Sequence, residues 1–217
     1  MDEIEKILAE QKESEELSDS QPEPLTEDED TEDEPAQEIS KVSAVKKELI
    51  EWIKAFLFAG VIVLVIFGFV IRPVEVKGHS MEPTLQNSDR LITWMLGYKP
   101  HSGDTVILSE KTGLDEALVK RVIATAGQTV DIDENGCVLV DGVLLDEDYI
   151  YEPIDAQHYG DWDYPVTVPE GYIFVMGDNR NHSTDSRFRE VGFVDEDEVV
   201  GKVVLRIMPL SSFGLID

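Results

Sequence analysis

The chain has 217 residues, enough for one domain with appended segments, and its formal net charge is −28. Because a chain this acidic repels the phosphate backbone of DNA and RNA, we expect no nucleic-acid partner. The single cysteine, Cys137, excludes an internal disulfide, so the folded part must be held together by its core. Cys137 follows Asn135-Gly136 and opens an aliphatic run, which indicates a packed strand residue rather than a nucleophile.

The N-terminal segment, residues 1–40, is strongly acidic, with 17 Asp or Glu against two Lys. It is also rich in Ser, Gln and Pro and almost lacks aromatic residues, so we expect a disordered tail. Ile4, Ile7 and Leu8 would share one face of a helix, which leaves open a transient helix within the tail that binds a partner.

An almost wholly apolar span covers residues 52–71 and follows a basic juxtamembrane segment at 41–51. Twenty helical residues rise about 30 Å, the hydrocarbon thickness of a bilayer, so the span is predicted to be a single transmembrane helix. More Lys residues precede the span than closely follow it, which favours a cytoplasmic N-terminus and an extracytoplasmic C-terminal domain. A cleavable signal peptide fits poorly because no small-x-small pattern follows, and a buried core helix fits poorly because the span has no polar face.

Residues 73–217 alternate short Val- and Ile-rich runs with turn signals, a pattern typical of β-strands. We therefore predict a mainly β fold, an extracytoplasmic antiparallel β domain that forms a partly closed barrel to protect its edges. Residues 128–171 hold many acidic and aromatic side chains and are expected to form a small cap subdomain, with hairpin turns at Asn135-Gly136 and Asp141-Gly142. Strands are expected at Arg90–Trp94, Asp104–Leu108, Leu118–Ala124, Thr129–Ile132, Cys137–Val140, Tyr172–Val175 and Val199–Ile207.

Two residues, Ser80 and Lys120, suggest nucleophilic catalysis close to the bilayer. Serine is a weak nucleophile unless a base takes its proton. A free lysine has a pKa of about 10.4, so it can be that base only where burial lowers the pKa. Lys120 stands in the aliphatic run Leu118–Ile123, which would supply an apolar pocket.

Histidine is the commonest base for a serine, and the chain has four. His79 adjoins Ser80, and neighbouring side chains on an extended segment point apart. His182, with Asp185 nearby as an orienting acid, is the alternative base. It lies in a polar loop at 177–187, and such a loop is costly to order unless it builds a site. The histidines show no metal-ligand spacing, so we expect no metal and no other cofactor.

Four ordered motifs resemble those of bacterial type I signal peptidases. This family consists of membrane-anchored endopeptidases that remove signal peptides from exported proteins by means of a Ser/Lys dyad. The resemblance spans residues 45–210 and leaves the acidic tail outside. The motifs are Ser80-Met81-x-Pro83-Thr84, Gly103-Asp104-x-Val106, Lys120-Arg121-Val122-Ile123 with Gly127, and Gly177-Asp178-Asn179-Arg180 through Ser183, Asp185 and Arg187.

The resemblance implies a role for each matched residue. Ser80 would attack the scissile carbonyl, and neutral Lys120 would take its proton and later protonate the leaving amine. Ser183 would orient Lys120 through a hydrogen bond. Gly78 stands where some members have a serine that helps the oxyanion hole, so backbone N–H groups, chiefly that of Ser80, would remain as donors. The supporting ion pairs would be Asp178 with Arg121 and Asp185 with Arg187.

The substrate implied by the resemblance is a secreted preprotein with a signal peptide. It would lie extended between the strand before Ser80 and the strand leading to Lys120, with small pockets for Ala-like residues one and three positions before the cut. Val74, Val76 and Met81 are expected to be apolar walls of these pockets. The lipid bilayer is a second expected partner, and the secretion translocase is a candidate partner.

Two other functions remain as alternatives. A soluble, self-cleaving Ser/Lys peptidase of the repressor type is disfavoured by the anchor and by the acidic charge. A non-catalytic, membrane-anchored assembly factor on the same fold would be marked by loss of the serine or the lysine, and both are present here.

Overall fold

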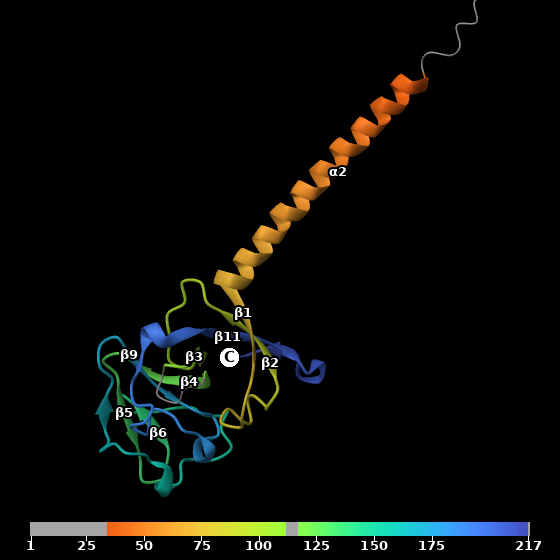
Figure 1. Ribbon diagram of the computed structural model, residues 1–217. Coiled ribbons are helices and arrows are strands. Elements are labelled where there is room, and N and C mark those ends of the chain that lie inside the picture. The colour runs from red at the N-terminus through yellow and green to blue at the C-terminus, as the bar shows by residue number, and fades with distance from the viewer. Residues whose placement is uncertain (1–33, 112–116, 217) are drawn as a thin grey trace, which may run out of the picture. The chain divides into compact units, whose positions relative to one another are not determined.

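The computed structural model describes residues 34–111 and 117–216, so most of the predicted acidic tail lies outside the described residues. The first element is the α-helix α2 (Glu34–Val65), which continues as one π-helical turn, η1 (Ile66–Val70) (Figure 1). Within it, Val45–Val70 is long and apolar enough to cross a bilayer, with a mean hydropathy of 2.7, and its side chains are exposed. A buried core helix is therefore not what the structure contains.

The helix begins earlier than the sequence suggested. Residues 34–40, assigned to the tail, and 41–51, assigned to the juxtamembrane segment, are both helical. This segment is rich in Glu, Lys and Ala, which have high helix propensity, so the helix extends beyond the apolar span. It ends one residue before the predicted boundary because Ile71 is already extended and opens strand β1 (Ile71–Glu75). Pro73 lies in that strand, at the edge of a sheet, where its missing N–H is tolerated.

Among the described residues, eight strands form a curled, antiparallel main sheet, which confirms the mainly β fold (Figure 1). Strands β1 and β10 lie at the two ends of the sheet order, so the sheet is not closed into a complete barrel. In spatial order the strands are β1, β2 (Arg90–Trp94), β11 (Val199–Met208), β3 (Thr105–Leu108), β4 (Leu118–Thr125), β9 (Tyr172–Met176) and β10 (Val194–Asp195), with β12 (Gly214–Leu215) beside β11.

A second, four-stranded sheet lies inside the segment 128–171, where the sequence indicated a subdomain. Its β6–β7 turn has positive φ at both Asp141 and Gly142, as the Asp-Gly pair suggested. The sheet shares a core with the main sheet, because Val130 and Val138 pack in one cluster with Phe174 of β9. Its strands are β7 (Val143–Leu144), β6 (Val138–Val140), β5 (Thr129–Ile132) and β8 (Val166–Thr167). Short 3-10 helices are η2 (Ala156–His158), η3 (Arg180–His182), η4 (Glu196–Glu198) and η5 (Leu210–Ser212).

A separate apolar cluster lies beneath the segment that follows β1. It joins residues of that segment to β2, β3 and β11, so the turn at Ser80 packs on this cluster, which we call the apolar floor. Its buried members are Val76, Met81, Leu85, Leu91, Ile107, Val203 and Ile216.

Close packing of β11 on β2 generates a stability prediction. A Cβ at Gly201 would collide with the carbonyl oxygen of Trp94 on β2. Gly201→Ala should therefore lower the free energy of unfolding by roughly 1–3 kcal/mol through overpacking. Gly214→Ala is the matched control, because nothing lies within 4 Å of its added methyl group. Denaturant unfolding of the detergent-solubilised protein measures both, and equal stabilities would contradict the prediction.

Candidate active site

The structure brings Ser80 and Lys120 into contact. Nζ of Lys120 donates a hydrogen bond to Oγ of Ser80 at 2.8 Å. Lys120 comes from β4, where it lies opposite Val106 of β3, and only 2% of it is exposed. Ser80 is half-buried in the turn after β1. The amine is therefore shielded from water while it touches the hydroxyl.

Local contacts fix the turn that carries Ser80. Met81 and Leu85 are buried in the apolar floor, and the N–H of Leu85 donates to the carbonyl of Met81 at 2.8 Å. Gly78 has a φ of +85°, a conformation that favours glycine, and its N–H donates to Oδ1 of Asn87 at 3.0 Å. The turn is thus held by its buried side chains and by its own backbone.

The loop after β9 packs directly against this turn. A Cβ at Gly177 would collide with the carbonyl oxygen of Ser80 and with Oγ of Ser183, so only glycine permits the approach. Asn179 makes two further bonds to the turn. Its N–H donates to the carbonyl of Ser80 at 3.0 Å, and Nδ2 donates to the carbonyl of His79 at 3.0 Å.

The predicted pair of Arg121 and Asp178 is formed and buried. Nε and Nη2 of Arg121 each donate to the carboxylate at 2.9 Å, and Nη1 donates to the carbonyl of Gly103 at 2.7 Å. The hydroxyl of Thr84 donates to the same carboxylate at 2.5 Å, and the guanidinium stacks 4.0 Å from the ring centre of Tyr149. Burial by itself would lower the pKa of Arg121, but its bonds to Asp178 raise it.

The second predicted pair, Asp185 with Arg187, is wholly buried. Nε and Nη2 of Arg187 donate to the carboxylate at 2.7 and 2.8 Å, and the N–H of Gly177 donates to it at 3.0 Å. Burial raises the pKa of the Asp185 carboxyl, but the charge and hydrogen bonds of Arg187 outweigh burial and hold the pKa below its ordinary value. The charge of Lys120 contributes in the same direction.

Ser183 does not make its predicted bond. Its Oγ is buried and has no hydrogen-bond partner among the described residues, whereas Lys120 donates to Ser80. The hydroxyl faces Gly177, beside the Ser80 carbonyl, so Ser183 lies at the site. His182, the alternative base, is exposed.

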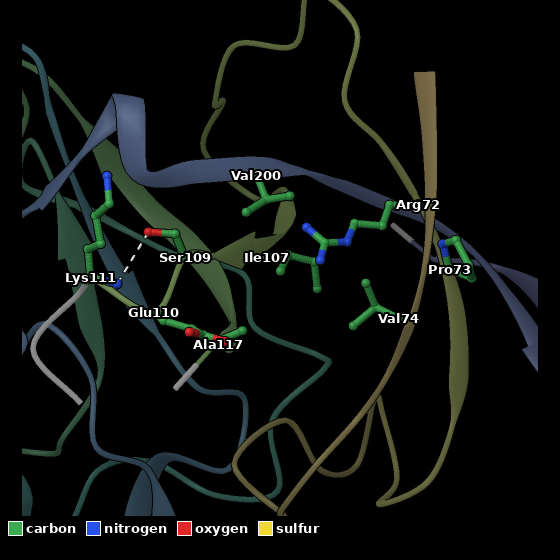
Figure 2. A pocket seen from close by; sticks show the side chains of 9 residues that line it. All are labelled: Arg72, Pro73, Val74, Ile107, Ser109, Glu110, Lys111, Ala117 and Val200. Atoms are coloured by element: carbon green, nitrogen blue, oxygen red, sulfur yellow. Dashed lines mark hydrogen bonds between the residues drawn. The ribbon is translucent and has the colours of Figure 1, made fainter. Parts of the chain in front are cut away.

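The predicted pocket walls need correction. Val76 is 3% exposed and Met81 1%, and both pack in the apolar floor, so neither offers a surface to a peptide. Met81 directly follows Ser80 and its side chain enters the core, while Val76 lies beyond the end of β1. Val74 does line a cavity of about 480 Å³. Figure 2 shows it, with Arg72 and Pro73 from β1 and Ile107, Ser109, Glu110, Lys111, Ala117 and Val200 as the other lining residues.

Residues 49–208 match the family model that is described as "Signal peptidase, peptidase S26". The chain belongs to this family. It is 36% identical over 186 residues to signal peptidase IB of Staphylococcus aureus, covering 78% of this chain and 94% of that protein. It is 38% identical over 175 residues to a probable signal peptidase I-1 of Synechocystis sp., and the match covers 76% of this chain and 85% of that protein. A crystal structure of a signal peptidase I from Enterococcus faecalis is 31% identical, covers 48% of this chain and 97% of that chain, and has a TM-score of 0.40.

Family membership supports a peptidase that acts in signal peptide cleavage, with preproteins as substrates. Together with the apolar helix, it indicates a membrane-anchored protein.

The lowered pKa of Asp185 contributes to the pH dependence of stability. A carboxyl with a folded-state pKa below its unfolded value of about 3.9 stabilises the fold fully above that value and loses the contribution as pH falls through the folded pKa. At neutral pH, Asp185→Asn should lower the free energy of unfolding by about 3–5 kcal/mol, because Arg187 stays buried without a counter-charge.

The difference in free energy of unfolding between wild type and Asp185→Asn should shrink as pH falls below about 3.9. Thermal unfolding at pH 7, 5, 4 and 3 measures it. Asp163→Asn, at an exposed position, is the control and should change little at any pH. A difference that stays constant down to pH 3 would show that the Asp185 carboxylate is not what stabilises the fold.

Proposed function

We propose that this chain is a membrane-bound serine endopeptidase that cleaves N-terminal signal peptides from exported preproteins, with Ser80 as nucleophile and Lys120 as general base. The observation that carries the proposal is the 2.8 Å contact between a buried lysine amine and the serine hydroxyl. A non-catalytic assembly factor would have no use for this contact. No metal and no cofactor enters the mechanism.

The geometry supports a two-step acyl transfer. Neutral Lys120 accepts the proton of Ser80 while Oγ attacks the scissile carbonyl carbon. The carbonyl oxygen becomes an oxyanion beside the N–H of Ser80, which donates no hydrogen bond to any of the described residues. The intermediate then collapses, and the Lys120 ammonium protonates the leaving amine. Lys120 then takes a proton from a water molecule as the water attacks the ester carbon. It returns that proton to Oγ of Ser80 as the ester bond breaks, which releases the carboxylic acid product and restores neutral Lys120.

The sheet offers edges for an extended substrate. β1 is the strand at one end of the main sheet. On β4, residues 118–120 pair with β3 on one side only, because pairing with β9 begins at Arg121. The cavity of Figure 2 lies beside the β1 edge. A peptide can add as a strand at such edges, with backbone bonds giving affinity and pocket size giving specificity for small residues. Val74 is the predicted pocket residue that keeps this role.

The bilayer is proposed as a partner of the β domain as well as of the helix. Trp94 pairs with Ile71, the first residue after the helix, and 43% of it is exposed. Leu205 pairs with Leu215, which is 78% exposed, on the neighbouring strands. Exposed apolar side chains such as these suit a lipid interface, which would hold Ser80 near its substrates. The secretion translocase remains a candidate partner.

The proton-transfer assignment can be tested with four variants on one preprotein. Lys120→Met keeps the apolar volume but removes the base, so the initial cleavage rate should fall at least ~10³-fold, as for Ser80→Ala. The cleavage rate of Ser183→Ala should lie between the wild-type rate and the rates of these two variants. The reason is that a hydrogen bond from Ser183 to the amine during the reaction is worth roughly 1–3 kcal/mol. His182→Ala is the control and should cost little. An inactive His182→Ala beside an active Lys120→Met would replace the Ser/Lys mechanism with a Ser/His one.

The wild-type rate should rise with pH as the Lys120 ammonium loses its proton. Its acid limb should follow one group that titrates below the ordinary lysine value of about 10.4. The pH profile of kcat/KM for the purified enzyme measures this titration, and a pH-independent rate between pH 5 and 9 would argue against a lysine base.

Topology is a separate prediction. The Lys-rich segment precedes the apolar span, so the N-terminus should be cytoplasmic and the β domain outside. Protease added to spheroplasts or protoplasts should digest the β domain and spare residues 1–50. Detergent lysis, as the control, should expose the tail to digestion. A tail cleaved from outside in unlysed cells would reverse the assignment.

A further inference from the structure

We propose that Asn179 is a positioning residue that aims the N–H of Ser80 at the oxyanion. It does so by holding the carbonyl of His79, which belongs to the same peptide unit as that N–H. The inference rests on the proposed function, since it assigns a partner to the backbone donor of that reaction.

The two hydrogen bonds of Asn179 lie on either side of the nucleophile. Nδ2 donates to the carbonyl of His79 at 3.0 Å, and the main-chain N–H donates to the carbonyl of Ser80 at 3.0 Å. The carbonyl of His79 and the N–H of Ser80 belong to one planar, trans peptide unit and point in opposite directions. A bond that fixes the first group therefore also fixes the direction of the second. It also polarises the unit, which strengthens the N–H as a donor.

The turn by itself holds this peptide unit weakly. The carbonyl of His79 also accepts a bond from the N–H of Glu82 at 3.2 Å, which lies within the same turn. Among the described residues, Asn179 supplies the only bond to that carbonyl from outside the turn. Gly78, with positive φ and no side chain, neither stiffens the turn nor offers a hydroxyl donor. The Ser80 N–H is therefore the main oxyanion donor, and its direction depends on Asn179.

Asn179 is itself held firmly. Its carbonyl accepts the N–H of His182 at 2.9 Å at the start of η3. Asp178 before it is paired with Arg121, and Arg180 after it donates to the carbonyl of Gly177 at 3.1 Å. The amide is thus anchored to the same buried loop that packs against Ser80, as a positioning group requires.

The test is steady-state kinetics of the full-length, detergent-solubilised enzyme on a preprotein. The oxyanion exists only in the transition state, so Asn179→Ala should lower kcat by about 10- to 100-fold and leave KM within about threefold. The acid limb of the pH profile should not move, because Lys120 remains the base. The inhibition constant of a substrate-like peptide aldehyde, whose Ser80 adduct carries the same oxyanion, should rise by a factor similar to the loss in kcat/KM.

Asn87→Ala is the matched control. Asn87 accepts the N–H of Gly78 at 3.0 Å, so this variant also removes one side-chain bond to the turn but does not touch the His79–Ser80 peptide. Its kcat should stay within about threefold of wild type. Asn179→Asp keeps the shape of the side chain and replaces the donor with an acceptor, so it should lose at least as much kcat as Asn179→Ala even if the alanine variant is unstable.

Three outcomes would overturn the inference: a kcat of Asn179→Asp close to wild type, a loss confined to KM, or losses in Asn87→Ala equal to those in Asn179→Ala. Retention of activity by Ser80→Ala is a different result, because it would refute the proposed function rather than the role of Asn179.

Discussion

The buried ion pair between Arg121 and Asp178 is the interaction on which the rest of the site depends. Arg121 follows Lys120 on β4, and Asp178 precedes Asn179 in the loop after β9. The same pair takes a bond from Thr84, behind the nucleophile turn, and donates one to the carbonyl of Gly103. All four sequence motifs therefore meet at one guanidinium and one carboxylate. Such a pair is weak evidence for stability, because desolvation opposes the attraction, but removing either partner leaves an uncompensated buried charge. Its effect here is geometric, since it fixes the segments that carry Ser80 and Lys120, the proposed nucleophile and base, relative to each other.

The nucleophile turn lies between two different kinds of environment. Below it, Met81 and Leu85 pack into an apolar floor, which holds the turn through shape. Beside it, Gly177 and Asn179 contact its backbone through a close approach and directed hydrogen bonds. The apolar floor fixes the buried side chains of Met81 and Leu85, and the loop holds the carbonyls of His79 and Ser80. A serine hydroxyl and its own N–H can then be aimed independently of each other, which an exposed turn in water could not achieve.

The sequence predicted those parts of the molecule that follow from local patterns. Alternating β-branched runs placed seven strands within one residue of their observed ends. The motifs singled out Ser80 and Lys120, and the family resemblance implied both ion pairs. The alternating runs did not show β1, which only the resemblance implied as a strand before Ser80, and they did not show four two-residue strands that are too short for alternation. The exposure of Val76 and Met81 depends on which face of a turn meets the core, which sequence spacing does not encode. The role of Asn179 depends on a contact across 100 positions, so no local pattern could indicate it.

Electrostatics around Lys120 completes the argument. A lysine can serve as base only while it is uncharged, and a buried carboxylate nearby would favour its charged form. Asp185 is such a carboxylate, and its pKa responds to the charge of Lys120. Arg187, however, donates two hydrogen bonds to Asp185, so the pair as a whole carries no net charge. The loop can therefore use Asp185 to hold Gly177 in place, through its N–H, without trapping the base as an ammonium. This explains why the site places a second buried arginine beside an acid that no step of the proposed reaction protonates.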